Sequence, residues 1–142
     1  AGGEAPDDPT PPELPVRAVV NMQAHTLLTR PTLIPLIARE MVDSQGRYAI
    51  DSVRNLVLAV FERLTDQIRA GQESGVFRAD VTPDFAAVST ISQIVYFFLA
   101  SPIIAIKLGR ENGITPDDIA RFAAHASDFA IAALRADPPP RQ

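Results

Sequence analysis

Apolar residues recur every three or four positions along most of this chain, and no segment alternates apolar and polar residues over the length of a strand. Such spacing is typical of amphipathic α-helices. Prolines and glycines interrupt the pattern and set the ends of the expected elements. The sequence therefore predicts an all-α helical bundle of about five to six helices, at residues 15–29, 33–42, 48–70, 83–101, 103–108 and 116–136.

The first and third expected helices each have one apolar side that should face a core. In the third, charged residues lie opposite the apolar positions. In the first, the positions expected to face inward are Val16, Val19, Val20, Gln23 and Leu27.

The fourth expected helix lies in a run without charge from Phe85 to Ile106. A membrane span is one interpretation of so long an uncharged run. Several polar residues and Pro102 interrupt it, which favours a helix buried by protein on all sides. Pro102 should kink or end this helix, because proline cannot continue the helical hydrogen bonding.

The last expected helix has two apolar sides. Its charged residues fall on one narrow stripe, and the remaining arc is wider than a single core requires. The side with Ile119, Phe122 and Phe129 is bulky and suits the subunit's own core, whereas the other side is mostly small. A second helix surface is therefore needed, and either the first helix of the same chain or a second copy could supply it.

We expect a second copy, because two-fold homodimers are common among soluble proteins. The last two long helices of each subunit would then form a four-helix bundle. The candidate interface residues are Ser89, Gln93, Ala120, Ala124, Ser127, Ile131 and Leu134.

Composition limits what else the chain contains. Prolines gather at both ends, so residues 1–13 and 137–142 read as Pro-rich segments that flank a helical domain at 14–136. The absence of cysteine excludes disulfides and thiolate metal sites. The net charge is −4 without a basic face, so we do not expect this chain itself to bind DNA. The first residues lack the features of a secretory signal, and we expect a cytoplasmic protein.

A specific pattern lies between the third and fourth helices, where G-Q-E-S-G-V-F-R-A-D at 71–80 precedes Thr82-Pro83-Asp84. Gly71 and Gly75 fit a helix end, Val76 and Phe77 should fix the turn onto a core, and Thr-Pro-Asp is a helix start. With R-E-M at 39–41, the pair Phe97-Phe98 and D-F-A-I-A-A-L-R-A at 128–136, this pattern resembles the C-terminal domain of TetR-family transcriptional repressors.

The resemblance implies a homodimeric domain that binds a small-molecule effector, in a protein that represses transcription until the effector binds. Operator DNA would be contacted only through an N-terminal helix-turn-helix domain, which this chain does not contain. In the family the effector cavity lies within each subunit, between the middle helices. Transferred to this chain, that suggests lining candidates at Met22, Met41, Arg54, Val57, Phe61, Gln93, Tyr96 and Phe97.

Two other functions are alternatives. An interaction module that dimerises without an effector fits the same pattern, and the sequence does not separate the two. An enzyme is not expected, because the chain has no nucleophile–base set and no phosphate-binding loop. A di-iron centre needs Glu-x-x-His pairs, but Met22 and Phe122 precede the two histidines at that spacing. We therefore expect no metal and no cofactor.

Overall fold

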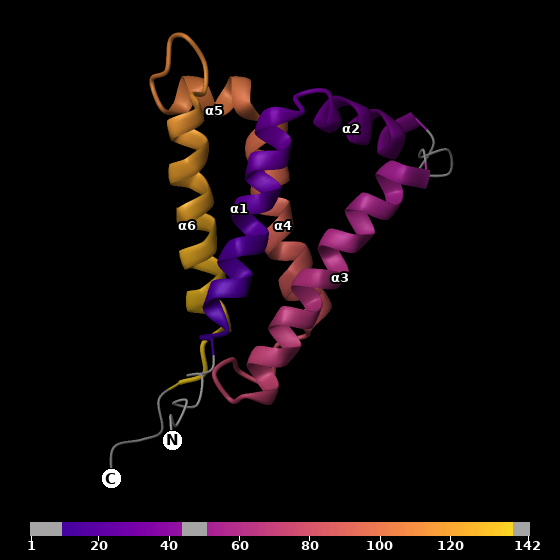
Figure 1. Cartoon of the computed structure of the whole chain (residues 1–142). Helices are drawn as coiled ribbons and strands as arrows, with labels where there is room; N and C mark the ends of the chain where they lie inside the picture. The colour runs from indigo at the N-terminus through magenta and orange to yellow at the C-terminus, as the bar shows by residue number, and fades with distance from the viewer. Residues whose placement is uncertain (1–9, 44–50, 138–142) are drawn as a thin grey trace, which may run out of the picture.

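The structure of the chain is a computed structural model that describes residues 10–43 and 51–137. Within these residues the chain forms helices and no strand. Figure 1 shows α1, α4 and α6 side by side, α3 inclined against them, and α2 and α5 across one end. The helices are α1 (Glu13–Thr29), α2 (Leu33–Asp43), α3 (Asp51–Glu73), α4 (Pro83–Leu99), α5 (Ser101–Lys107) and α6 (Pro116–Leu134).

The predicted all-α fold is confirmed, and most helix bounds agree within a few residues. The predicted start of the third helix, at residue 48, lies outside the described residues. The first helix begins at Glu13, two residues before the predicted start, so that Pro15 lies in its first turn. Proline is tolerated there because the first backbone N–H groups of a helix have no helical partner.

Two connected groups of buried side chains form the core. All five inward positions predicted for the first helix are buried, so this prediction is confirmed. One group joins α1, α3, α4 and α6 at the end of the bundle near the α3–α4 connector, and includes Val16, Leu64, Phe77, Ile91 and Leu134. The other joins α1, α2, α4 and α6 near α5, and includes Val20, Leu27, Ile34, Phe97 and Ile119.

The connector after α3 departs from the prediction at Gly71. This glycine stays inside α3, which continues to Glu73, and it is Gly75 that takes the left-handed conformation, with φ 79°. Gly71 is needed for another reason: a Cβ at this position would overlap the ring of Phe77. Phe77 is fully buried, as predicted, but Val76 is exposed.

α4 and α5 meet at a bend of 81°. α4 ends at Leu99, and Pro102 is the second residue of α5, where the missing N–H costs no helical bond. In the described part of the chain no single helix is long and apolar enough to cross a membrane. Only α4 and α5 taken together, across their bend, reach that length and composition.

α6 is rotated relative to the prediction. Ser127, Ile131 and Leu134 were expected to meet a partner chain, but they are buried in the subunit's own core, where α1 packs against α6. Phe129 was expected inside and is 61% exposed. The neighbouring helix, rather than the size of the side chains, decides which side of α6 is covered.

Candidate functional site

A pocket of about 500 Å³ opens between α4, α5, the α5–α6 loop and α6. Its volume lies in the range of small-molecule sites. Most of its surface is apolar, and the charged groups come from three residues of the loop and α6. The lining residues are Tyr96, Phe97, Ile104, Leu108, Arg110, Asp118, Arg121 and Phe122.

A stacked aromatic pair forms one wall of this pocket. The rings of Phe97 and Phe122 lie with centroids 4.1 Å apart and planes inclined by 14°. Phe97 is buried, so the pair connects α4 to α6 within the core. Tilted ring contacts continue outward from Phe122 through His125 to Phe129, with centroid distances of 5.9 Å and 6.1 Å. One side of α6 thus presents a row of rings next to the pocket.

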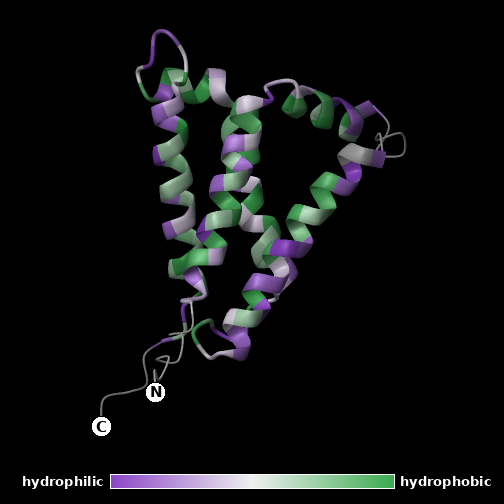
Figure 2. Ribbon diagram, viewed as in Figure 1, coloured by the Kyte–Doolittle hydropathy of each residue, from purple (hydrophilic) through white to green (hydrophobic). Residues whose placement is uncertain are grey.

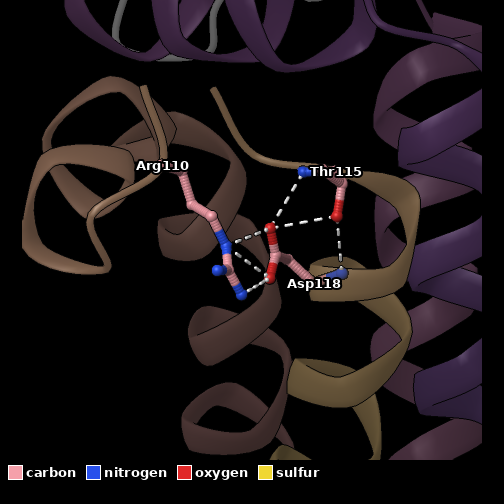
Figure 3. A network of polar contacts seen from close by, with 3 residues as sticks. All are labelled: Arg110, Thr115 and Asp118. Carbon is pink, nitrogen blue, oxygen red and sulfur yellow. Dashed lines mark hydrogen bonds and ion pairs between the residues drawn. The ribbon is translucent and has the colours of Figure 1, made fainter. Parts of the chain in front are cut away.

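Asp118 is the most connected polar residue of the pocket (Figure 3). Its carboxylate accepts two bonds from Arg110 Nε at 3.1 Å and one from Arg110 Nη2 at 2.7 Å. It also accepts from the backbone N–H of Thr115 at 3.1 Å and from the Thr115 hydroxyl at 3.0 Å. The side chain of Asp118 is only 5% exposed, although the sequence placed it on a polar stripe.

These contacts favour the ionised carboxylate. The hydrogen bonds from Arg110, followed by that from the Thr115 backbone, hold the pKa of Asp118 well below its ordinary value. The same pairing raises the pKa of Arg110. Charge-assisted bonds of this kind are shorter and stronger than neutral ones. Asp118 is therefore an anion at neutral pH, and it fixes the Arg110 guanidinium at the edge of the pocket.

Local sequence explains how this pair forms. Thr115 and Asp118 make a capping box, since the Asp118 N–H also donates to the Thr115 hydroxyl at 3.1 Å. The loop before it turns at Gly109 and Gly113, both with positive φ, which favours glycine. These turns bring Arg110 back over the start of α6. Asp118 thus caps its own helix and binds the loop that leads into it.

A second, smaller pocket of about 370 Å³ lies between α3 and the start of α4. Phe61 and five polar residues line it. Three of these are acidic, and one of them, Asp84, accepts a hydrogen bond from Thr65 at 3.2 Å. In the described residues no group of three or more His, Cys, Asp or Glu side chains is placed to hold a metal ion.

Beside the first pocket, large apolar side chains remain exposed on the side of the molecule formed by α4, α5 and α6. We call them the apolar outer face. Phe85, at 73% exposure, and three further α4 residues follow one another at helical spacing. The apolar outer face consists of Phe85, Val88, Tyr96, Leu99, Ile103, Ile106 and Phe129.

Comparison with known families decides the kind of domain. Residues 12–129 match the family described as Tetracyclin repressor-like, C-terminal domain. The chain belongs to this family. It is thus a domain of a TetR-type transcriptional regulator, a class of proteins that are generally not enzymes. No curated protein and no solved structure matches the chain.

The TetR-type structure brings together only part of the predicted ligand-binding set. Tyr96 and Phe97 line the first pocket and Phe61 lines the second. The other candidates line neither of these pockets. Met22, Met41 and Arg54 are exposed, Val57 is half-buried, and Arg54 pairs with Asp51 at 3.6 Å.

Gln93 belongs to both predicted sets, the ligand-binding residues and the dimer interface. It is half-exposed, and its amide donates to the Ser89 carbonyl of the preceding turn at 3.4 Å. The buried glutamine is Gln23 of α1, whose amide donates to the Ile91 carbonyl at 3.5 Å. Among the described residues its Oε1 has no hydrogen-bond partner, nor has the buried Ser127 hydroxyl.

The polar residues of the first pocket were not predicted. Thr115 directly precedes the helix predicted at 116–136, and its spacing to Asp118 is the signal that could have indicated a capping box. Arg110 offered no such signal, because it lies eight residues before Asp118 and outside any helix. Arg121 was assigned to a solvated stripe, and only the placement of α5 reveals that it borders a pocket.

Proposed function

We propose that this chain is the dimerisation and effector-binding domain of a transcriptional repressor. A small, largely apolar effector would alter DNA binding by an N-terminal domain that is not part of this chain. The family supports this function in outline, since its members are ligand-binding and dimerisation domains of regulators. The dimer and the effector are the parts that need evidence from the chain itself.

The apolar outer face is the observation that supports a dimer. Monomeric proteins rarely expose large contiguous apolar patches, and such patches mark interaction sites. α4 and α6 pack against each other within the subunit, and each carries exposed aromatic rings on this side. Two copies meeting through α4 and α6 would cover both helices at once, in a four-helix bundle with two-fold symmetry.

The interface proposed here differs in part from the set inferred from the sequence. Ser89 and Gln93 remain in it, because both lie on the partly exposed side of α4. Ala120 and Ala124 are exposed, but at 100° per residue they lie roughly 180° and 140° around α6 from Phe129. They therefore lie outside the face that contains the aromatic side chains.

Sedimentation equilibrium of the purified chain at micromolar concentration tests the dimer. The wild type should have the mass of two chains. Leu99→Glu places a charge in the interface and should weaken the dimer by about a hundredfold or more, because an unpaired buried charge costs several kcal/mol. Leu58→Glu on α3 is the matched control, because Leu58 is 48% exposed and Leu99 52%. The control should remain a dimer.

Two further variants make the result specific. Phe129→Glu should also give monomers, whereas Ala124→Glu on the other side of α6 should not. Circular dichroism checks that each variant keeps its helices. A wild-type monomer, or equal dissociation of Leu99→Glu and Leu58→Glu, contradicts the proposed interface.

The proposal that an effector binds is supported by the pocket of about 500 Å³, which the Phe97–Phe122 stack borders. Thermal-shift screening against small molecules tests it, since a ligand that binds only the folded state raises its stability. A dimer that responds to no compound would favour the alternative function, an interaction module without an effector.

A further inference from the structure

The pocket between α4, α5 and α6 has two chemically different parts. Its body is formed by Tyr96, Phe97, Ile104, Leu108 and Phe122, which offer only rings and aliphatic groups apart from the tyrosine hydroxyl. Such a surface takes up an apolar group, because burial removes apolar area from water. The depth of the pocket is fixed by the Phe97–Phe122 stack, which belongs to the folded core.

The other part of the pocket holds two guanidinium groups. Arg110 uses Nε and Nη2 for Asp118, which leaves its Nη1 without a hydrogen bond in the described part of the chain. Because Asp118 holds the group in place, little side-chain entropy remains to be lost when Nη1 binds a ligand. Arg121, in the first half of α6, makes no ion pair with any described residue.

Among the residues that line the pocket, the charges leave one cation unbalanced; Asp117, which also acts electrostatically on Arg110, lies outside the lining. Arg110 and Asp118 neutralise each other as a close pair, so Arg121 contributes a net positive charge to the pocket. An anion is therefore favoured beside an otherwise apolar surface, and a cation is disfavoured. A planar carboxylate matches guanidinium geometry, since it can accept two parallel N–H bonds.

We propose that this pocket binds an amphipathic carboxylate, with its apolar tail against the Phe97–Phe122 stack and its carboxylate at Arg121 and Nη1 of Arg110. The proposal rests on the proposed function, in that it names the class of effector and its position. It places the effector between α4, α5 and α6. This position borders the apolar outer face, because Tyr96 belongs both to the pocket and to that face. A site between the middle helices was expected from the family resemblance.

The experiment compares three ligands that share one tail: octanoate, octan-1-ol and octyltrimethylammonium. Binding is followed by chemical-shift titration of isotope-labelled isoleucine methyl groups, because Ile104 lines the pocket and reports on its occupancy. Octanoate should shift the Ile104 signal and bind about fivefold more tightly than octan-1-ol, which is the gain expected from one partly exposed ion pair. Octyltrimethylammonium should bind the most weakly.

Variants then show which residue causes the preference for octanoate over octan-1-ol. Arg121→Gln should bind octanoate and octan-1-ol with equal affinity, and it removes no ion pair from the described fold. Arg54→Gln, on α3 and outside the pocket, is the matched control and should keep the wild-type preference. Leu108→Asp adds an anion to the exposed wall of the pocket and should abolish octanoate binding.

Sedimentation of the same samples separates this proposal from the dimer. A dimer that does not bind octanoate, or that binds octanoate and octan-1-ol equally, overturns the proposed ligand class and leaves the dimer standing. A monomer that binds octanoate at Ile104 with the Arg121-dependent preference supports the ligand class and overturns the dimer. Octanoate that shifts isoleucines elsewhere but not Ile104 overturns the site.

Discussion

Two connectors in this molecule end in the same three residues and are stabilised in different ways. Thr82-Pro83-Asp84 opens α4, and Thr115-Pro116-Asp117 opens α6. In each, proline lies at the first helical position and aspartate in the first turn. Only at Thr115 does the side chain make the capping bond; Thr82 makes none.

The connector before α4 is held by apolar packing, by backbone pairing and by the Gln72 amide, which donates to the Arg78 and Val81 carbonyls; its Arg78–Asp80 ion pair is exposed. Phe77 is buried against Gly71, and its N–H donates to the Gly71 carbonyl at 2.9 Å. The next residues pair with the end of α6: Arg78 N–H donates to the Leu134 carbonyl at 2.8 Å, and Ala136 N–H to the Val76 carbonyl at 3.0 Å. This connector thus joins α3 to α6 through the core.

The connector before α6 is held by charge, through the pair of the partly exposed Arg110 with the buried Asp118, and by the capping box. Figure 2 shows polar and apolar segments alternating along α3, and few polar segments on α5. The difference shows that a helix-start signal predicts where a helix begins. It does not predict which interactions hold that end in place, because those come from residues distant in sequence.

The largest effect is expected for Phe77→Ala. Removing a fully buried phenylalanine leaves a cavity and typically costs about 3–5 kcal/mol of unfolding free energy. Urea denaturation followed by circular dichroism measures the loss. Val76→Ala, the exposed neighbour, should change the stability by less than about 1 kcal/mol. Similar losses for both variants would show that the connector does not depend on its buried ring.

Gly71→Ala comes next. Alanine is the better helix former by about 1 kcal/mol, so propensity alone predicts stabilisation. The added methyl group would overlap the Phe77 ring, and overpacking typically costs about 1–3 kcal/mol. We therefore expect a net loss in the same denaturation measurement. In the double variant with Phe77→Ala the cost should disappear, because the ring is gone; an unchanged cost would place its cause elsewhere.

The two threonines offer a direct comparison of the helix starts. Thr115→Ala removes the capping hydroxyl and should cost about 1 kcal/mol. Thr82→Ala removes a hydroxyl that makes no capping bond, and it should cost at most a few tenths of a kcal/mol of unfolding free energy. Thermal unfolding of the two variants side by side measures the difference. Equal shifts in melting temperature would contradict the assignment of the cap to Thr115 alone.

These cases also show how far the sequence could predict the fold and the site. Helix order, the break near Pro102 and the burial of Phe77 follow from local spacing, and the structure confirms them. The rotation of α6 and the pairing of Arg110 with Asp118 depend on where α1 and α5 lie, which local spacing does not record. For this reason Phe129 was expected inside, and Asp118 on a polar stripe.

Asp118→Asn tests the charge of the second connector, and its effect should depend on pH. Arg110 and the Thr115 backbone lower the pKa of Asp118 in the folded state, so the unfolded chain binds its proton more readily as the pH falls. The stabilisation is therefore present above the ordinary aspartate pKa of about 3.9 and is lost as the pH falls below it. Asparagine keeps one acceptor oxygen but has an NH2 group in place of the other, so the variant loses part of the hydrogen bonding to Arg110 or Thr115 as well as the charge. Denaturation at pH 7 should show the variant to be less stable than the wild type, and at pH 3 the difference should be smaller, because the loss is complete only below the lowered pKa of the folded state. An equal difference at both pH values would mean that Asp118 acts through its shape and hydrogen bonds, so that charge does not hold the second connector in place.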